Sequence, residues 1–182
     1  EAAVSAYERA LELEPESTLT IDRLVPLYEE ADESERLVEL YVRRVELARP
    51  DEDELRYALS MKAAARQEGP LENPREAILS FNAALEAKAG DPEALKALER
   101  LYRSEELFPE LLENLRDQAG RATQTADRAA LLVAIGDLYK DKLNGPVDAL
   151  EQYRLVLDEM PDHEQAIAAL RSIAETNDDL RL

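Results

Sequence analysis

Three basic side chains share one face of a short helical stretch. Lys96, Arg100 and Arg103 follow one another at positions i, i+4 and i+7, opposite an apolar stripe formed by Leu95, Leu98, Leu101 and Tyr102. A basic strip bordered by apolar side chains favours binding of an extended acidic peptide or of a C-terminal carboxylate. The alternative is that Glu93 and Glu99 pair with these cations on a solvated helix.

Few residues have the type and the spacing that catalysis requires. His163 is the only histidine, and its place just after Pro161 favours an exposed loop residue over a general base. The acidic run 51–54 lacks the alternating oxygen ligands, turn glycine and distal glutamate of a calcium loop, which favours a capped helix start instead. The five glycines are scattered and form no phosphate-binding loop. We therefore expect no enzyme activity, no cofactor and no metal.

The composition favours helices. Hydrophobic residues make up 45% and aromatic residues only 5%, while alanine, leucine, glutamate and arginine dominate. No apolar run approaches the roughly 20 residues of a membrane span. The sequence contains no cysteine, which excludes disulfides and does not by itself identify the compartment; the cytoplasm is our expectation.

The net charge of −19 argues against nucleic acid or an anionic membrane as the main partner. The charge is unevenly spread: residues 1–54 hold 17 acidic and 6 basic side chains, residues 55–104 hold 7 and 8, and residues 105–182 hold 17 and 8. The nearly neutral middle contains the basic strip. We therefore expect a protein or peptide partner, acidic where it meets this strip.

The elements that must position these side chains are clearest between residues 124 and 162. Apolar residues recur there at the spacing of two helices, with Leu132, Ile135, Gly136 and Tyr139 on the first, Ala149, Tyr153 and Val156 on the second, and Pro161 after them. Two antiparallel helices pack closely where small residues meet, so we expect Gly136 and Ala149 at the contact.

This order resembles the tetratricopeptide repeat (TPR), whose pattern W-x2-L-G-x2-Y…A-x3-F…P it follows with Leu132 in place of the tryptophan. The resemblance implies an all-α fold, a right-handed superhelical array (α-solenoid) of antiparallel helix pairs. Tyr28, Tyr102 and Tyr139 set a period of roughly 37 residues, somewhat longer than the usual 34, which related helical-pair repeats also tolerate.

We expect residues 1–182 to form a single array. Its parts would be 1–15 as the second helix of a truncated repeat, helix pairs at 18–50, 53–90, 92–123 and 126–161, and 164–182 as the start of a further repeat. The chain opens inside a repeat, so we expect a fragment of a longer protein.

Local signals refine these boundaries. The copy at 53–90 is degenerate, because it lacks the leucine and tyrosine of the other first helices. Helix starts are expected at the capping residues Asp32, Asn73 and Asp162, and a loop is expected over residues 120–127.

In TPR arrays the first helices line a concave groove. The resemblance therefore implies a partner-binding groove that joins Tyr57, Met61, Lys96, Arg100, Arg103, Asp137 and Lys140. The family's carboxylate clamp of lysines and asparagines is not matched. Asp22, Pro26 and Glu29 occupy its groove face in the earliest hairpin, and Asn82 and Asn114 fall on second helices, so chaperone tails are not the expected ligand.

Together these features favour a non-catalytic protein-protein interaction scaffold that binds a peptide or protein segment. Three alternatives stay open. The chain would be a structural spacer or self-assembly segment that associates end to end, the regulatory region of an enzyme whose catalytic domain lies outside it, or an RNA-binding protein, for which basic residues and exposed aromatic residues are scarce.

Overall fold

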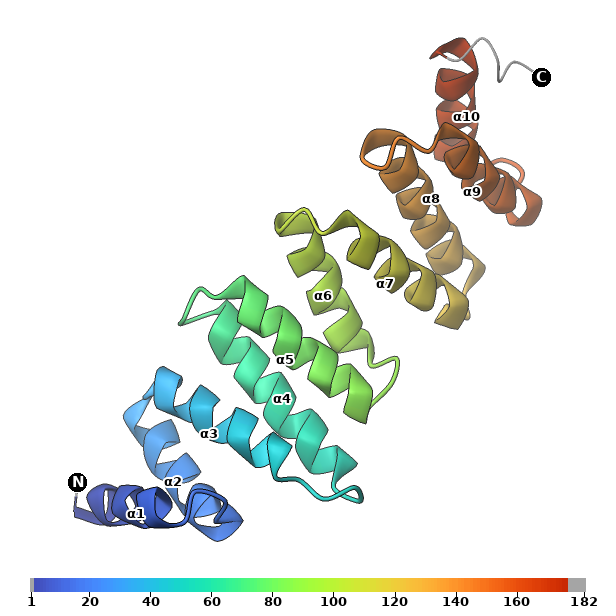
Figure 1. Cartoon of the computed structure of the whole chain (residues 1–182). Helices are drawn as coiled ribbons and strands as arrows, with labels where there is room; N and C mark the ends of the chain where they lie inside the picture. The colour runs from blue at the N-terminus through green and yellow to red at the C-terminus, as the bar shows by residue number, and fades with distance from the viewer. Residues whose placement is uncertain (1, 177–182) are drawn as a thin grey trace. The chain divides into compact units, whose positions relative to one another are not determined.

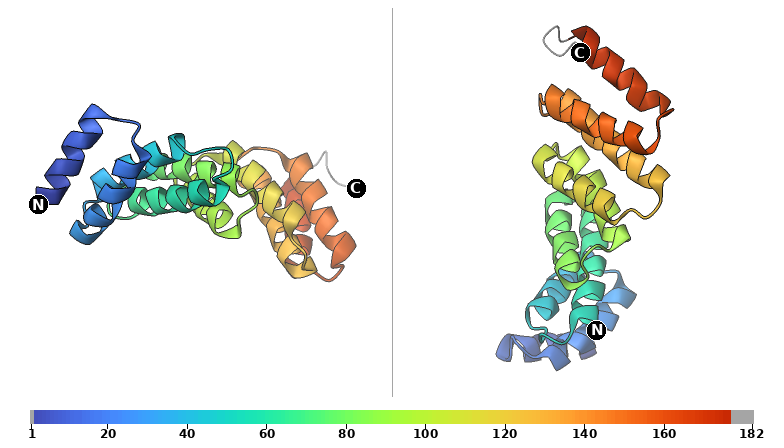
Figure 2. Two further views of the ribbon diagram at one scale, coloured as in Figure 1. Left: turned by 90° about the horizontal axis from the view of Figure 1, so that it is seen from below. Right: turned by 90° about the vertical axis from the view of Figure 1, so that its right-hand side faces the viewer.

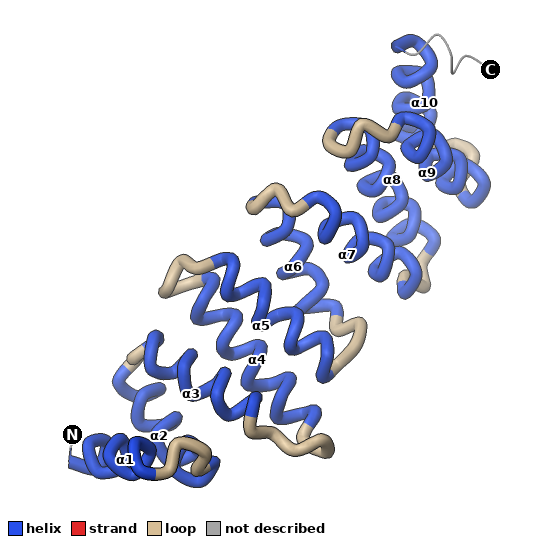
Figure 3. The backbone as a smooth tube through the Cα atoms, viewed as in Figure 1, coloured by secondary structure: helices blue, strands red, loops and turns tan. Residues whose placement is uncertain are grey.

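The computed structural model describes residues 2–176, and its regular structure in that range is entirely helical (Figures 1 and 3). The helices are α1 (Ala2–Leu13), α2 (Thr18–Ala31), α3 (Ser34–Glu46), α4 (Asp53–Glu68), α5 (Pro74–Ala87), α6 (Pro92–Ser104), α7 (Phe108–Arg121), α8 (Thr125–Asp141), α9 (Pro146–Glu159) and α10 (Glu164–Thr176). Our expectations for Glu1 and for residues 177–182 lie outside the described range.

The chain divides into two compact units, Glu1–Leu98 and Glu99–Leu182. Consecutive helices pack side by side from α1 to α5 in the first unit, as α4 and α5 do in Figure 2, and from α7 to α10 in the second. Short connections force such neighbours to run antiparallel. The prediction of an all-α protein built from antiparallel helix pairs is therefore confirmed, and the single array over 1–182 stays a prediction.

The turns within four helix pairs share one backbone conformation. Asp32, Glu72, Glu106 and Asn144 have φ values of 53°, 47°, 57° and 50°, and each follows the first helix of a pair. A residue with left-handed backbone lets the chain reverse after a helix. The next residue in each turn then donates its N–H to a carbonyl near the helix end: Glu33 to Tyr28 at 3.1 Å, Asn73 to Gln67 at 2.7 Å, Leu107 to Tyr102 at 2.8 Å and Gly145 to Tyr139 at 2.9 Å.

These turn hydrogen bonds show how the pair at 53–90 keeps the common turn although it lacks the tyrosine. Gln67 accepts the turn hydrogen bond at the place that Tyr28, Tyr102 and Tyr139 occupy in the other pairs. The 53–90 pair therefore has the same turn as the others, although a glutamine replaces its tyrosine. Gln67 is buried, and its side-chain amide lies 2.6 Å from Ser80 Oγ on α5.

The core of the first unit lies between its early helices. Ile21, Leu24 and Tyr28 of α2 pack with Leu37, Leu40 and Tyr41 of α3, and with Leu59 and Ala63 of α4. In the second unit, Gly136 on α8 lies against the ring of Tyr153 on α9, and Ala149 is fully buried. Gly136 therefore lies at a close contact, as predicted, but the atoms nearest to it belong to Tyr153 and not to Ala149.

Of the three capping residues predicted from the sequence, one is confirmed. Asn73 accepts a hydrogen bond from the N–H of Glu76 at 3.4 Å, as predicted. Asp32 was predicted wrongly, because its left-handed backbone belongs to the turn and α3 begins at Ser34. His163, not Asp162, caps α10: its Nδ1 accepts from the N–H of Ala166 at 3.4 Å.

The loop predicted over 120–127 is also wrong. Helix α7 continues to Arg121 and α8 begins at Thr125, so only three residues, Ala122 to Gln124, connect them. Arg121 and Asp117 form an ion pair of 2.9 Å along the exposed side of α7, and this pair stabilises the last turn of the helix.

Candidate functional site

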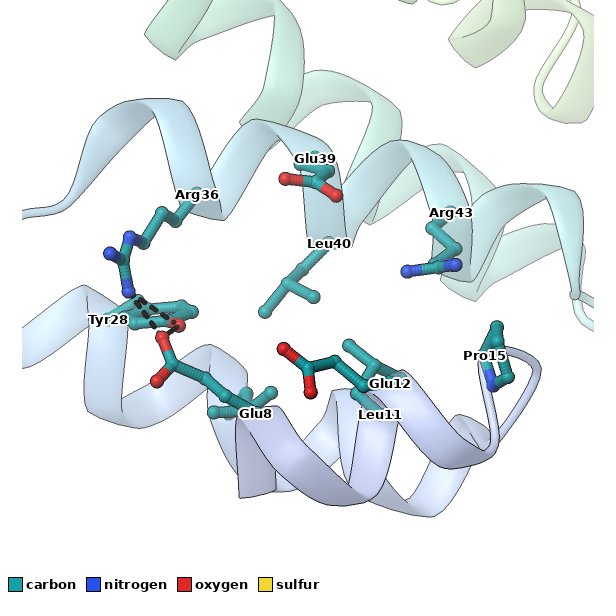
Figure 4. Close-up of a pocket in the computed structure, with 10 residues that line it drawn as sticks. Glu8, Leu11, Glu12, Pro15, Tyr28, Arg36, Glu39, Leu40 and Arg43 are labelled. Atoms are coloured by element: carbon teal, nitrogen blue, oxygen red, sulfur yellow. Dashed lines mark hydrogen bonds and ion pairs between the residues drawn. The ribbon is translucent and has the colours of Figure 1, made fainter. Parts of the chain in front are cut away.

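A cleft of about 530 Å³ opens between α1 and α3 (Figure 4). Each wall presents residues at i, i+3, i+4 and i+7, the spacing that aligns side chains along one side of a helix. These are Glu8, Leu11, Glu12 and Pro15 from α1 and the residues that follow it, and Arg36, Glu39, Leu40 and Arg43 from α3. Leu24 and Tyr28 of α2 form the floor.

One end of the cleft is closed by a hydrogen-bond network. The Tyr28 hydroxyl donates to Glu8 Oε1 at 2.6 Å, and the Arg36 guanidinium donates to the same carboxylate and, at 3.1 Å, to the Tyr28 oxygen. Burial, followed by the hydrogen bond to Glu8, raises the pKa of Tyr28. The phenol therefore stays protonated at neutral pH and ties α1 to α2.

The rest of the cleft carries charges without partners. Figure 4 shows Glu12 and Arg43 pointing into the hollow from opposite walls, with Glu39 at its upper edge. Among residues 2–176, no hydrogen bond or ion pair engages the side chains of Glu12, Glu39 or Arg43. These three groups are thus available to an incoming molecule.

The floor beneath these charges is apolar. Leu24 and Leu40 are 1% and 4% exposed, and Leu11 lies beside them on the α1 wall. An apolar floor with a few charged groups at the edge is the usual composition of a site that holds a side chain of another polypeptide. Among the residues that the structure describes, the lining contains no serine, threonine, cysteine or histidine, and its arrangement is suited to binding.

Of the residues predicted to form a groove, Tyr57 and Met61 lie half-buried on α4. The Tyr57 ring lies 4.5 Å from Lys88 Nζ, and burial, together with a hydrogen bond to Asp91, raises the pKa of its phenol. Tyr57 is therefore engaged with the start of α6 inside its own unit.

Asp137 and Lys140 lie together on α8 of the second unit. Asp137 accepts hydrogen bonds from Tyr153 at 2.7 Å and from Gln165 at 3.5 Å, and Lys140 Nζ lies 3.8 Å from its carboxylate. The carboxylate thus links α8 to α9 and α10. Its position relative to Tyr57 and Met61, which belong to the first unit, stays a prediction.

The basic strip lies exposed on α6. Lys96, Arg100 and Arg103 all project to solvent, and Arg103 pairs with Glu99 at 3.2 Å. Glu99 also accepts from Gln118 Nε2 at 3.0 Å. The alternative of cation–glutamate pairing along the helix is therefore realised for Arg103, and the binding role of the strip stays a prediction.

Other sequence candidates have structural roles. In the acidic run, Glu52 accepts from the N–H of Arg49 at 2.8 Å and pairs with Arg44 at 3.2 Å; the hydrogen bond from Arg49 is the main cause that lowers its pKa. Asp22 pairs with Arg44, and Glu29 with Lys62 and Tyr41. Within residues 2–176, no group of three metal-binding side chains comes together, and no helix is long and apolar enough to cross a membrane.

The sequence analysis did not identify the α1–α3 cleft. A signal was present, because three charged residues, Arg36, Glu39 and Arg43, lie with Leu40 at helical spacing on one side of α3. It was missed because the groove was inferred from the family's first helices, whereas both walls of the cleft come from second helices.

Comparison with known proteins gives structural likenesses only. No protein-family model and no curated protein matches the chain. Among solved structures, YrrB, described as a TPR protein with an unusual peptide-binding site, is 20% identical at a TM-score of 0.48, over 94% of this chain and 83% of that one. A structure of MamA is 15% identical at a TM-score of 0.48, over 95% of this chain and 90% of that one.

A further MamA structure, residues 41 to the end from Desulfovibrio magneticus RS-1, is 14% identical at a TM-score of 0.44, over 90% of this chain and 87% of that one. Likenesses of this size attach no function to the chain. Its own hairpins, turns and Gly136 contact define the fold. Over the described residues 2–176 the fold is a helical repeat, a succession of antiparallel helix pairs.

Proposed function

We propose that this chain is a non-catalytic scaffold that binds a segment of another polypeptide in the cleft between α1 and α3. The observation that carries the proposal is the set of three unpartnered charges, those of Glu12, Glu39 and Arg43, above a floor of leucines. A side chain that is charged and unpaired in the free protein can bind a partner without first breaking an internal ion pair.

The charges define the partner. An apolar side chain would occupy the floor beside Leu24 and Leu40. A lysine or arginine on one side of it would approach Glu12 and Glu39, and an acidic group or a C-terminal carboxylate would approach Arg43. The ligand is therefore an extended segment in which an apolar residue lies between a basic and an acidic group.

The closed end supports this mode of binding. The bonds among Tyr28, Glu8 and Arg36 hold the walls at a fixed separation before any ligand arrives. A site that is already ordered loses little conformational entropy on binding, which favours affinity from a small contact area.

Selection of peptides against the purified chain tests the proposal. A phage-displayed library of short linear peptides is enriched on the immobilised chain, and the selected peptide is measured by fluorescence anisotropy. Arg43→Glu should weaken its binding about tenfold, and the sequence selected should combine an apolar residue with charges of both signs.

Arg23→Glu is the matched control. Arg23 lies exposed on α2, does not line the cleft, and its reversal changes the net charge by the same amount. Binding to this variant should change less than about twofold. Equal losses in both variants, or no enrichment of any peptide, would reject the cleft as the binding site.

The α6 strip is a second candidate surface for the same function. It is favoured by the exposure of Lys96, Arg100 and Arg103 in the nearly neutral part of an acidic chain. Double charge reversal of Arg100 and Arg103 should weaken binding of an acidic peptide, with a larger loss at low salt. Unchanged affinity rejects the strip and leaves the cleft unaffected.

A further inference from the structure

Another side of α3 lines a second hollow, which lies over α4 and reaches α5. Its volume is about 260 Å³. The walls again present residues at helical spacing, with Val42, Val45 and Glu46 on α3 and Glu76, Leu79, Ser80 and Ala83 on α5. We call this hollow the α3–α5 groove.

Two large apolar side chains of the groove are exposed. Val42 and Leu79, on opposite walls, are 38% and 62% exposed. A single exposed leucine needs no explanation, but two apolar side chains that border one hollow form a patch whose burial would be favourable.

Two buried polar side chains of the groove, Gln67 and Ser80, satisfy each other. With its nitrogen toward α5, the Gln67 amide also donates to the Glu76 carbonyl at 3.1 Å and to the Ala63 carbonyl at 3.3 Å. Because Gln67 and Ser80 are satisfied, an apolar side chain that covers them leaves neither of them unpaired.

The charge of the groove is of one sign. Its charged lining residues within the described range are Glu46 and Glu76, one on each wall. A second copy of this chain carries a net charge of −19 and would be repelled. The complementary ligand carries lysine or arginine on both sides of an apolar face.

We propose that the α3–α5 groove docks an amphipathic helix of another protein, with an apolar face flanked by basic residues. Ridges of side chains, at i, i+3 and i+4 on the α3 wall and at i, i+3, i+4 and i+7 on the α5 wall, match the ridges of a third helix laid along them. The hollow has room for a few side chains of such a helix. This surface and its ligand differ from the α1–α3 cleft and its extended segment, and the inference goes beyond the proposed function.

A synthetic helical peptide tests the proposal. The fluorescein-labelled probe carries leucines on one face at i, i+3, i+4 and i+7 with lysines on both sides, and a control probe replaces the leucines by alanine. The first should bind the full chain, and the second should bind at least about tenfold more weakly, because it retains the charge but lacks the apolar face. Equal binding of both probes overturns the proposal.

Leu79→Asp should weaken binding of the leucine probe at least about tenfold, because it places a charge in the apolar wall. Val147→Asp is the matched control, since Val147 is also 62% exposed but lies on α9, outside the groove. It should change binding less than about twofold. Circular dichroism melting confirms that both variants fold, and an equal effect of the two substitutions overturns the proposal.

Paired neutralisations separate the two hollows. The double variant Glu46→Gln and Glu76→Gln should weaken binding of the leucine probe several-fold and reduce the salt dependence of that binding. The double variant Glu12→Gln and Glu39→Gln, which changes the charge equally at the cleft, should do neither. Loss of binding only in the second pair assigns the probe to the cleft and rejects the groove. Self-association in sedimentation that Leu79→Asp abolishes assigns the groove to a second copy and also rejects the proposal.

Discussion

Tyr153 lies so close to Gly136 that a Cβ atom on Gly136 would come within 2.7 Å of the Tyr153 ring. Tyr153 is fully buried, so its ring has no room to retreat. Gly136→Ala should therefore lower the free energy of unfolding by roughly 1–2 kcal/mol, since overpacking costs more than the roughly 1 kcal/mol that alanine contributes to helix formation. Urea denaturation measures the change.

Gly120→Ala is the control for this prediction. Gly120 lies in α7 of the same unit, and a Cβ there would meet no atom within 4 Å. Alanine should raise stability at this position by about 0.5–1 kcal/mol. Similar effects at the two glycines would contradict the close contact, as would a failure of Tyr153→Leu to relieve the cost of Gly136→Ala.

The α8–α9 pair was predictable because its small and aromatic residues follow a known order, and the physical demand for a small residue at a close contact is visible in sequence. The turns were not. Asp32, Glu72, Glu106 and Asn144 share a left-handed backbone, yet two of them are glutamates, which carry no distinctive signal for it. Gln67 was missed for a related reason, because it accepts the turn hydrogen bond through its backbone carbonyl, which every residue type has.

The phenols of Tyr41 and Tyr153 predict a loss of stability at alkaline pH. Each is buried and donates to a carboxylate at 2.7 Å, Tyr41 to Glu29 and Tyr153 to Asp137. Burial, followed by these hydrogen bonds, raises both pKa values well above the value of about 10 in the unfolded chain.

Above about pH 10 the unfolded chain loses phenolic protons that the folded chain retains, so the free energy of unfolding falls as the pH rises. Tyr153→Phe should reduce this slope and cost about 0.5–1.5 kcal/mol at neutral pH. Urea denaturation across the alkaline range measures both effects. A slope that is the same with Phe at positions 41 and 153 would contradict the assignment.

Asp91 should stabilise the fold except in acid. It is 5% exposed, accepts from the N–H groups of Glu93 and Ala94 at 3.1 Å, and pairs with Lys88 at 3.0 Å. Burial alone would raise the pKa of Asp91, but the hydrogen bonds from Lys88 and from the Ala94 N–H outweigh it and lower the pKa.

The contribution of Asp91 is therefore present above about pH 4, the unfolded value, and is lost as the pH falls through the lower folded value. Asp91→Ala should cost about 1–2 kcal/mol at pH 7 as a lost helix cap. Asp91→Asn should cost less, because asparagine also caps, and should flatten the acid decline. Asp127→Asn, in the exposed first turn of α8, is the control and should cost only a few tenths of a kcal/mol, because it removes a charge near the helix N-terminus but no cap.

The candidate site shows where sequence reasoning ends. The basic strip on α6 was visible as a spacing of like charges along one helix. The cleft is formed only where two second helices meet across α2. Its key property is that Glu12, Glu39 and Arg43 have no partner among residues 2–176, and this depends on which side chains lie nearby. Arg36 and Arg43 look equivalent in sequence, seven residues apart on α3, yet Arg36 is bonded to Glu8 and Tyr28 while Arg43 is not.

The left-handed turns give the last prediction. Glu106 adopts a φ of 57°, which costs a residue with a Cβ about 1 kcal/mol relative to glycine, and its side chain is exposed. Glu106→Gly should therefore raise the free energy of unfolding by a few tenths to about 1 kcal/mol, because relief of the strain exceeds the added entropy of the unfolded chain. Glu33→Gly is the control: Glu33 follows Asp32 in the corresponding turn but has a φ of −80°, so glycine there relieves no left-handed strain. A gain in urea denaturation that is larger for Glu106→Gly than for Glu33→Gly would establish the strain at Glu106, and equal effects would contradict it.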